Sequence, residues 1–284
     1  MGSHTQAEAS LLAVECAICN GTGWVIKEPA KGHREAARCA CQQALVASAN
    51  LRRASIPERF AHCDFDNFLP NYAGVNASLS RAKKEVLDFS QSYPLERTGV
   101  LLTGTIGTGK THLAIAALKY LITEVNAVGL YCDYGDLIQS LRDSNSQNSG
   151  TTETQILQPI LTAEVLLLDE LGAANPSDYA FEKIRTIVQA RYNRNLTTIF
   201  TTNYPNLPPG GGAKGEATLG DRIAERVRSR IVEMCSHVDM QGSDYRQNGP
   251  KKGRTTSSRM IEPVQDHPVA PSKPATRKKV QGVR

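Results

Sequence analysis

The stretch that decides the fold is GTIGTGKT, which comprises Gly104, Thr105, Ile106, Gly107, Thr108, Gly109, Lys110 and Thr111. It has the form G-x-x-x-x-G-K-[ST]. The apolar run TGVLLT (98–103) before it predicts a strand, and HLAIAAL (112–118) after it predicts a helix. Strand, glycine-rich loop and helix in this order are typical of a phosphate-binding P-loop.

The chemistry of the P-loop assigns a role to each part of this stretch. Backbone N–H groups of the loop and the positive end of the helix would surround phosphate oxygens. Lys110 would reach the β- and γ-phosphates, and the Thr111 hydroxyl would bind Mg²⁺. We include the next residue, His112, in the predicted ATP site.

Two further apolar runs end in polar residues. VLLLDE (165–170) predicts a buried parallel strand that ends at Asp169 and Glu170. Ligands of open α/β sheets lie at the carboxyl ends of the strands, so Asp169 is expected to hold Mg²⁺ and Glu170 to orient the attacking water. The run TTIFTTN (197–203) predicts a neighbouring strand whose Asn203 would contact the γ-phosphate or that water.

The segment Leu219–Cys235 predicts one amphipathic helix. Its apolar residues recur every four positions at 223, 227 and 231, and arginines recur with the same spacing at 222, 226 and 230. One face would pack, and the adjacent face would present three guanidinium groups. We expect either a solvated basic face or an arginine finger that reaches the nucleotide of a neighbouring copy.

Four of the seven cysteines form two close pairs near the N-terminus: Cys16, Cys19, Cys39 and Cys41. Paired cysteines in an intracellular ATPase favour metal binding over disulfides, and four thiolates suit tetrahedral Zn²⁺. The second pair has one intervening residue instead of two, and His33 is an alternative ligand. A closed four-cysteine site would be a structural staple that presents a partner-binding surface.

Composition limits the remaining possibilities. The 284 residues carry a net charge of +5, but residues 247–284 hold nine Lys/Arg and two acidic residues, so the tail carries +7 and the rest −2. We therefore expect a basic, disordered tail, either solvated or in contact with a polyanion. No apolar run is long enough for a membrane span and the start is not a secretory signal, so we expect a cytoplasmic protein without a membrane partner. The predicted domains are a Cys₄ module (1–55), a connector (56–97), an ATPase core (98–246) and the tail (247–284).

Taken together, GTIGTGKTHLA, VLLLDELG, IFTTNYP and DRIAERVRSRIVEMC…GSDYR resemble the AAA+ ATPases of the DnaC/DnaI helicase-loader family. IstB-type transposition ATPases share most of these motifs. The resemblance spans about residues 56–246 and implies an α/β fold with a five-stranded parallel sheet in the order 5-1-4-3-2, helices on both faces and no C-terminal lid. It implies that Asn203 is sensor 1, that Arg230 is the arginine finger in trans, with Arg226 as second choice, and that Arg246 is a weak candidate for sensor 2.

The function that the resemblance implies is ATP hydrolysis coupled to loading of a replicative helicase. Its cofactors would be ATP, Mg²⁺ and structural Zn²⁺, and its partners a DnaB-type helicase, single-stranded DNA and further copies of the chain. An IstB-like ATPase that assists a transposase is the main alternative. A P-loop phosphotransferase would need an acceptor pocket and a lid, for which the sequence has no evident segment, and a slowly hydrolysing nucleotide switch is a fourth possibility.

Overall fold

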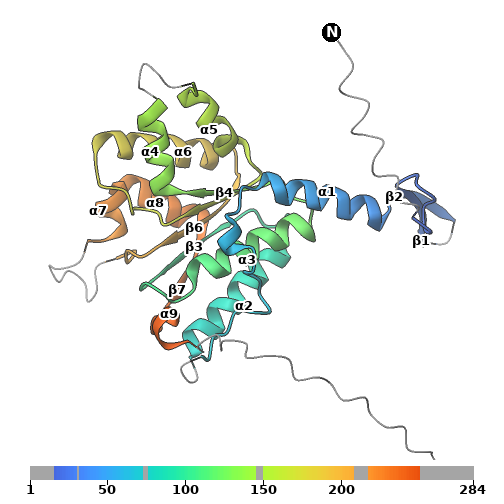
Figure 1. The fold of residues 1–284 in the computed structure, drawn as a ribbon, viewed down its shortest axis with the longest axis horizontal. Coiled ribbons are helices and arrows are strands. Elements are labelled where there is room, and N and C mark those ends of the chain that lie inside the picture. Colours follow the sequence, from blue (N-terminus) through green and yellow to red (C-terminus); the bar gives the residue numbers. More distant parts are fainter. Residues whose placement is uncertain (1–15, 31, 73–75, 145–149, 208–216, 250–284) are drawn as a thin grey trace, which may run out of the picture. The chain divides into compact units, whose positions relative to one another are not determined.

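The central feature of the computed structural model is a five-stranded parallel sheet (Figure 1). The structure describes residues 16–30, 32–72, 76–144, 150–207 and 217–249. The strands are β3 (Gly99–Gly104), β4 (Gly129–Asp133), β5 (Val165–Asp169), β6 (Thr197–Thr202) and β7 (Cys235–Met240), in the spatial order β4-β5-β6-β3-β7. Numbered along the chain and read from β7, this is the predicted order 5-1-4-3-2, which is confirmed.

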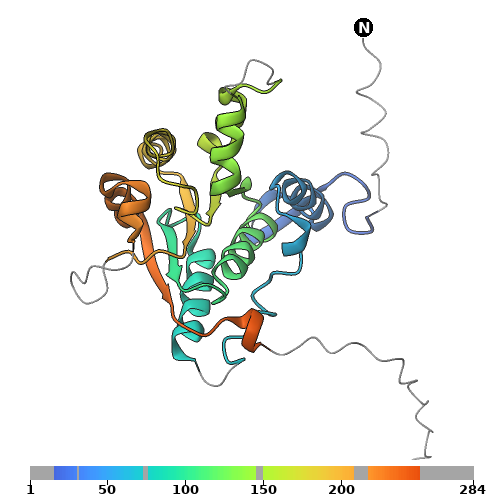
Figure 2. The ribbon, with the colours of Figure 1, turned by 60° about the vertical axis from the view of Figure 1, so that its left-hand side comes forward.

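Alternating side chains of each strand enter two separate cores. In β5, Val165 and Leu167 pack into one core, and Leu166 and Leu168 into the other. Helices α2 (Ala77–Ser92) and α3 (Lys110–Thr123) cover the first face. The second face is covered by α4 (Tyr134–Ser144), α5 (Glu153–Thr162), α6 (Asp178–Asn193), α7 (Leu219–Ile223) and α8 (Glu225–Met234), as Figures 1 and 2 show. A strand buried on both faces reads as a continuous apolar run, which is why VLLLD was recognisable in the sequence.

The prediction of one continuous helix over Leu219–Cys235 is wrong. The helix is interrupted at Ala224, whose φ of 72° and ψ of 138° separate α7 from α8. A capping box between Thr218 and Asp221 sets the start of α7. The predicted apolar stripe nevertheless survives the break, because residues 223, 227 and 231 are all buried.

The N-terminal part of the described chain is an antiparallel hairpin followed by a helix. Strands β1 (Trp24–Ala30) and β2 (His33–Arg38) pair, and α1 (Ala40–Arg53) leads to a short 3₁₀ helix, η1 (Glu58–Phe60). The end of α1 belongs to the ATPase core, since Ala54 is fully buried there and its carbonyl accepts a hydrogen bond from the Tyr131 amide. The side chain of His33 and residues 250–284 of the predicted tail lie outside the described residues.

A last short helix, α9 (Tyr245–Asn248), follows β7. Its N-cap Asp244 lies against the loop that joins β3 to α3, so the end of the described core is folded back onto that loop. Among the helices that the structure describes, none is both long and apolar enough to cross a membrane.

Candidate functional site

The loop between β3 and α3 depends on glycine at positions of close contact. Gly107 and Gly109 have φ angles of 80° and 92°, which L side chains rarely adopt. A Cβ atom on Gly109 would lie 2.6 Å from the ring of Phe68, and one on Gly107 would collide with Asp244. The loop is therefore enclosed between the connector and α9, and the Tyr245 amide donates a hydrogen bond to the Gly107 carbonyl at 3.0 Å.

Lys110 lies over this loop. Its Nζ donates to the carbonyls of Gly104 at 2.8 Å and Thr105 at 2.7 Å. Burial lowers the pKa of Lys110 to about 8, while the nearby Asp169 and Glu170 oppose that shift. The charge of Arg246 also lowers the pKa of Lys110, so this arginine acts on the loop from the C-terminal side.

A hydrogen bond joins the end of β5 to α3, the helix that follows the loop. Thr111 Oγ1 donates to Asp169 Oδ1 at 3.0 Å. Octahedral Mg²⁺ holds adjacent oxygens at a separation of about 2.9 Å, so this hydroxyl–carboxylate pair fits the ion. The residues that the sequence predicted as Mg²⁺ ligands, 58 positions apart, are thus brought together.

Thr201 on β6 connects Asp169 to Glu170. Its hydroxyl donates to Asp169 Oδ1 at 2.5 Å and accepts from the Glu170 amide at 2.9 Å. Glu170 has a φ of 53°, an uncommon conformation for a residue other than glycine. The Thr201 hydroxyl therefore fixes both the carboxylate and the turn that follows it.

Burial dominates the ionisation of the two acids. It raises the pKa of Asp169, and hydrogen bonds from Thr201, Thr111 and Tyr131 partly offset this effect. Tyr131 reaches the other carboxylate oxygen, Oδ2, at 3.3 Å from the neighbouring strand β4. Burial and the charge of Asp169 likewise raise the pKa of Glu170. A cation beside these carboxylates would favour their ionised forms.

The predicted polar residues outside the loop have different surroundings. Asn203 follows the end of β6 and is exposed. Arg222 is turned inward: it donates to the carbonyls of Gly172 at 2.8 Å and Ala174 at 2.9 Å and stacks on Tyr204. The prediction that it shares one face with the other two arginines is therefore wrong, because the break at Ala224 changes its direction.

The remaining two arginines of the predicted stripe lie one turn apart on α8. Arg226 is exposed and borders a groove between α6 and α8 that Phe181 also lines. Arg230 is half-buried and lies near Tyr192, whose hydroxyl bonds Glu233 at 2.6 Å. The structure describes no hydrogen bond or ion pair made by either guanidinium within the part of the chain that it covers.

The four predicted zinc ligands converge. The sulfurs of Cys16 and Cys39 are 3.7 Å apart, those of Cys19 and Cys41 are 3.5 Å apart, and all four lie within 4.8 Å of one another. Sulfurs around tetrahedral Zn²⁺ are separated by about 3.8 Å, so the arrangement fits this ion. Backbone hydrogen bonds lower the pKa of Cys16 to about 6, and the Gly23 amide donates to the Cys19 sulfur. The hairpin β1–β2, which the sequence did not predict, separates the two pairs.

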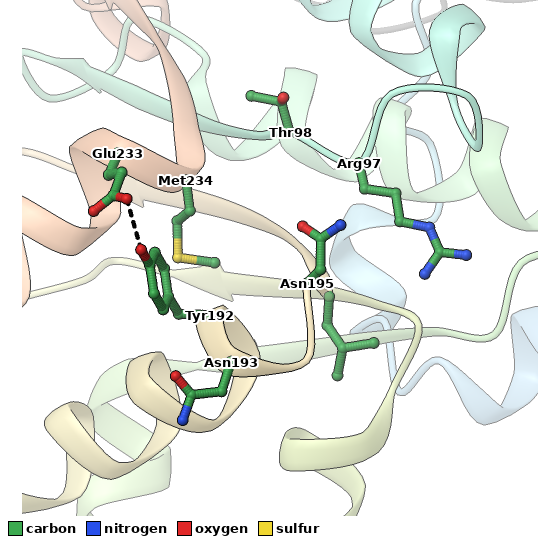
Figure 3. Close-up of a pocket in the computed structure, with 8 residues that line it drawn as sticks. Arg97, Thr98, Tyr192, Asn193, Asn195, Glu233 and Met234 are labelled. Atoms are coloured by element: carbon green, nitrogen blue, oxygen red, sulfur yellow. Dashed lines mark hydrogen bonds between the residues drawn. The ribbon is translucent and has the colours of Figure 1, made fainter.

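A cavity of about 670 Å³ lies at the opposite edge of the sheet (Figure 3). It is lined by Arg97 and Thr98, which precede β3, by residues 192, 193, 195 and 196 before β6, and by Glu233 and Met234 at the end of α8. Parallel strands begin at this edge, whereas the loop and the acids lie where the strands end. The cavity is therefore separate from the predicted ATP site.

Sequence reasoning missed several residues that shape the site. Thr201 lies two positions before Asn203, and side chains two positions apart on a strand point to the same face of the sheet. This period of two could have drawn attention to Thr201. Tyr131 and Asp244 had no comparable signal, because their contacts join segments that are distant in the chain.

Comparisons with known proteins agree with this geometry. Residues 47–253 match the family model described as IstB-like ATP binding protein. The replicative helicase loader DnaC of Escherichia coli strain K12 is 28% identical over 186 residues, which cover 66% of this chain and 71% of the loader. A crystal structure of the DnaC helicase loader superposes with a TM-score of 0.56 at 32% identity and covers 65% of this chain and 99% of the other. A DnaI crystal structure, with a TM-score of 0.51 at 24% identity over 67% of this chain and 94% of the other, shares the AAA+ fold. The family match begins at residue 47, so the hairpin and its cysteines lie before it.

Proposed function

Because the chain belongs to the family of IstB-like ATP-binding proteins, and because it is similar to replicative helicase loaders, we propose that it hydrolyses ATP and loads a replicative helicase onto DNA. The observation that carries the hydrolytic part is the contact of Thr111 with Asp169, next to Lys110 and Glu170. A phosphate-binding loop and two acids at one sheet edge are what a metal-assisted attack of water requires.

Each residue of this edge has a role in the proposal. The amides of residues 104–112 bind the phosphates, and Lys110 neutralises their charge. Thr111 and Asp169 hold Mg²⁺, which supplies charge neutralisation at the transferred phosphoryl group. Glu170 orients the attacking water, and Asn203 contacts that water or the terminal phosphate. Catalysis then depends on positioning and on charge stabilisation rather than on a covalent intermediate.

Glu170→Gln tests the hydrolytic role. The amide keeps the shape of the side chain but is a much weaker base, so ATP turnover should fall by roughly 10²–10⁴-fold while nucleotide affinity is retained. Wild-type turnover in this variant would reject the assignment of Glu170. Glu164→Gln is a matched control, because this acid lies at the opposite end of β5 and accepts a hydrogen bond from the Val128 amide.

Assembly is the second part of the proposal. A finger from a neighbouring copy would complete the site, with Arg230 as first choice and Arg226 as second. Substitution of the true finger by Ala should reduce turnover by about 10³–10⁵-fold without loss of ATP binding. The two single variants distinguish these residues, and Arg185→Ala, on the α6 side of the same groove, is the control. Full turnover in both variants would reject the assignment of a finger to Arg230 or Arg226.

The Cys₄ hairpin is the proposed contact for the helicase. Its exposed side chains include Ile18, Trp24 and Ile26, with 71%, 54% and 72% of their surface accessible. Apolar side chains gathered on a small module favour binding to another protein. Trp24→Ala with Ile26→Ala should weaken capture of a DnaB-type helicase and leave ATP turnover unchanged. Leu95→Ala, which removes an exposed leucine outside the hairpin, should weaken neither.

Zn²⁺ held by the four cysteines would stabilise that hairpin. Removal of the metal with a chelator selective for Zn²⁺ over Mg²⁺ should therefore abolish helicase capture before it affects nucleotide binding, because the ATP site belongs to the other sheet. Cys16→Ser should have the same effect without a chelator. Intact capture by a metal-free protein would contradict this role.

The family description favours a second candidate, an ATPase that assists a transposase. The hydrolytic site would be the same, and the partner would differ. Capture experiments with ATP and DNA decide between the two: retention of a DnaB-type helicase supports the loader, and retention of a transposase in its place rejects it. We include single-stranded DNA as a partner of the assembled loader.

A further inference from the structure

A second group of metal-binding side chains lies beside the P-loop helix. It consists of His62 and Cys63, in the connector after η1, and His112, in the first turn of α3. One ligand atom from each residue lies within 4.8 Å of the other two, and Cys63 Sγ is 3.9 Å from His62 Nε2. None of these three residues belongs to the Cys₄ cluster.

The His112 ring is oriented by a backbone carbonyl. Its Nε2 lies 2.9 Å from the carbonyl oxygen of Asp64. A carbonyl only accepts, so Nε2 carries the proton and Nδ1 keeps a free lone pair. Histidines that bind metals usually donate their other ring N–H in this way, which fixes the tautomer. The Phe68 ring, 5.5 Å away, packs against the imidazole from the side.

The turn that carries the other two ligands is tied to α3 independently of any metal. Lys119 Nζ donates to the carbonyls of Ala61 and Cys63, both at 3.0 Å, and pairs with the Asp64 carboxylate at 2.7 Å. Because Asp64 neutralises Lys119, the ammonium adds little net charge beside the cluster. The cysteine is 2% exposed, whereas His62 is at the surface, so an ion has a route to a preformed group of ligands.

We propose that His62, Cys63 and His112 bind a second transition-metal cation of the Zn²⁺ class. Two imidazoles and one thiolate form a donor set of intermediate softness, which suits Zn²⁺ or Co²⁺ and not Mg²⁺. Three protein ligands leave one tetrahedral position for water. Such an ion would fasten the connector to α3 at His112, which is one residue after Thr111.

The test uses the full chain, stripped of metal and titrated with Co²⁺ and Zn²⁺ under reducing conditions. The wild type should bind two equivalents. Cys63→Ser and His62→Gln should each bind one, or bind the second at least tenfold more weakly. The histidine is exposed, so His62→Gln keeps the test valid if the buried substitution disturbs folding. In Cys63→Ser the thiolate-to-cobalt absorption should fall by about one fifth, since one of five thiolates is lost.

Two controls separate this site from other thiols. A Cys16→Ser, Cys41→Ser variant removes half of the Cys₄ cluster and should still bind one equivalent through the second site. Cys132→Ser removes a half-buried thiol outside both clusters and should still bind two. A wild type whose only bound equivalent is lost in the Cys16→Ser, Cys41→Ser variant, or a second equivalent that survives both Cys63→Ser and His62→Gln, would overturn the proposal.

Discussion

Thr201→Val is the substitution that most directly tests how Asp169 and Glu170 are positioned at the end of β5. Valine has nearly the same shape as threonine but cannot donate to Asp169 or accept from the Glu170 amide. A hydrogen bond to a charged group contributes about 1.5–3 kcal/mol, and an N–H left without a partner costs about 1–3 kcal/mol, the lower values applying to the partly buried Glu170 amide. The structure therefore predicts a total penalty on the order of 3–5 kcal/mol, divided between stability and site geometry.

The catalytic share of this penalty is what the assay measures. If about 2 kcal/mol is lost from the transition state, ATP turnover falls by roughly 30-fold. A Thr201 hydrogen bond also lowers the Asp169 pKa, so its loss should move the acid limb of the pH–rate profile to higher pH. Steady-state ATPase assays across pH, together with urea unfolding, separate the two shares. Thr201→Ser keeps the hydroxyl and should restore most of the activity.

The neighbouring residue offers a matched control. Thr202 is equally buried, and its hydroxyl donates to the Leu171 carbonyl at 2.8 Å and accepts from the Tyr204 amide at 3.1 Å. Thr202→Val thus loses the same number of hydrogen bonds without touching either acid. It should lose stability and keep turnover. Equal activity in the two valine variants would refute the claim that Thr201 positions Asp169 and Glu170.

Three further predictions concern charge and backbone. Burial lowers the pKa of Lys110 to about 8 from its ordinary value of 10.5. Between these pH values only the unfolded chain keeps this proton, so the destabilisation caused by burying Lys110 fades as the pH rises through that window. Since only the ammonium attracts phosphate, ATP affinity measured by fluorescent-nucleotide titration should fall above pH 8, and Lys110→Arg should remove that dependence. Arg191 is fully buried and donates to three carbonyls and the Thr198 hydroxyl, so Arg191→Met should cost about 3 kcal/mol in urea unfolding, and a loss under 1 kcal/mol would contradict this. Ala224 has a backbone conformation that favours glycine, so Ala224→Gly should stabilise the protein by about 1 kcal/mol, seen as a higher melting temperature, and a lower one would contradict the strain.

The loop and the strand ends were predictable because their signals are local. GTIGTGKT needs glycines and a lysine at fixed spacing, and VLLLDE needs only a strand buried on both faces that ends at the ligand edge. The cysteine pairs could also be recognised in the sequence, since a zinc site requires particular side chains. The strand order came with the resemblance and not from the apolar pattern, which carries no information about which strands are neighbours.

What the tertiary structure alone decided are contacts between distant parts of the chain. Thr201 meets Asp169 across 32 positions, and Asp244 closes on Gly107 from the other end of the core. No glycine or proline stands at position 224 to indicate the interruption of the helix, and the helical period of residues 219–235 continues through it. The sequence therefore predicted the wrong direction for the Arg222 side chain. A sequence determines by itself what its neighbouring residues favour, namely the loop, the strands and the metal-binding cysteines. Packing decides which hydroxyl, amide or guanidinium contacts the loop and the strand ends, because these groups come together only when the sheet is assembled.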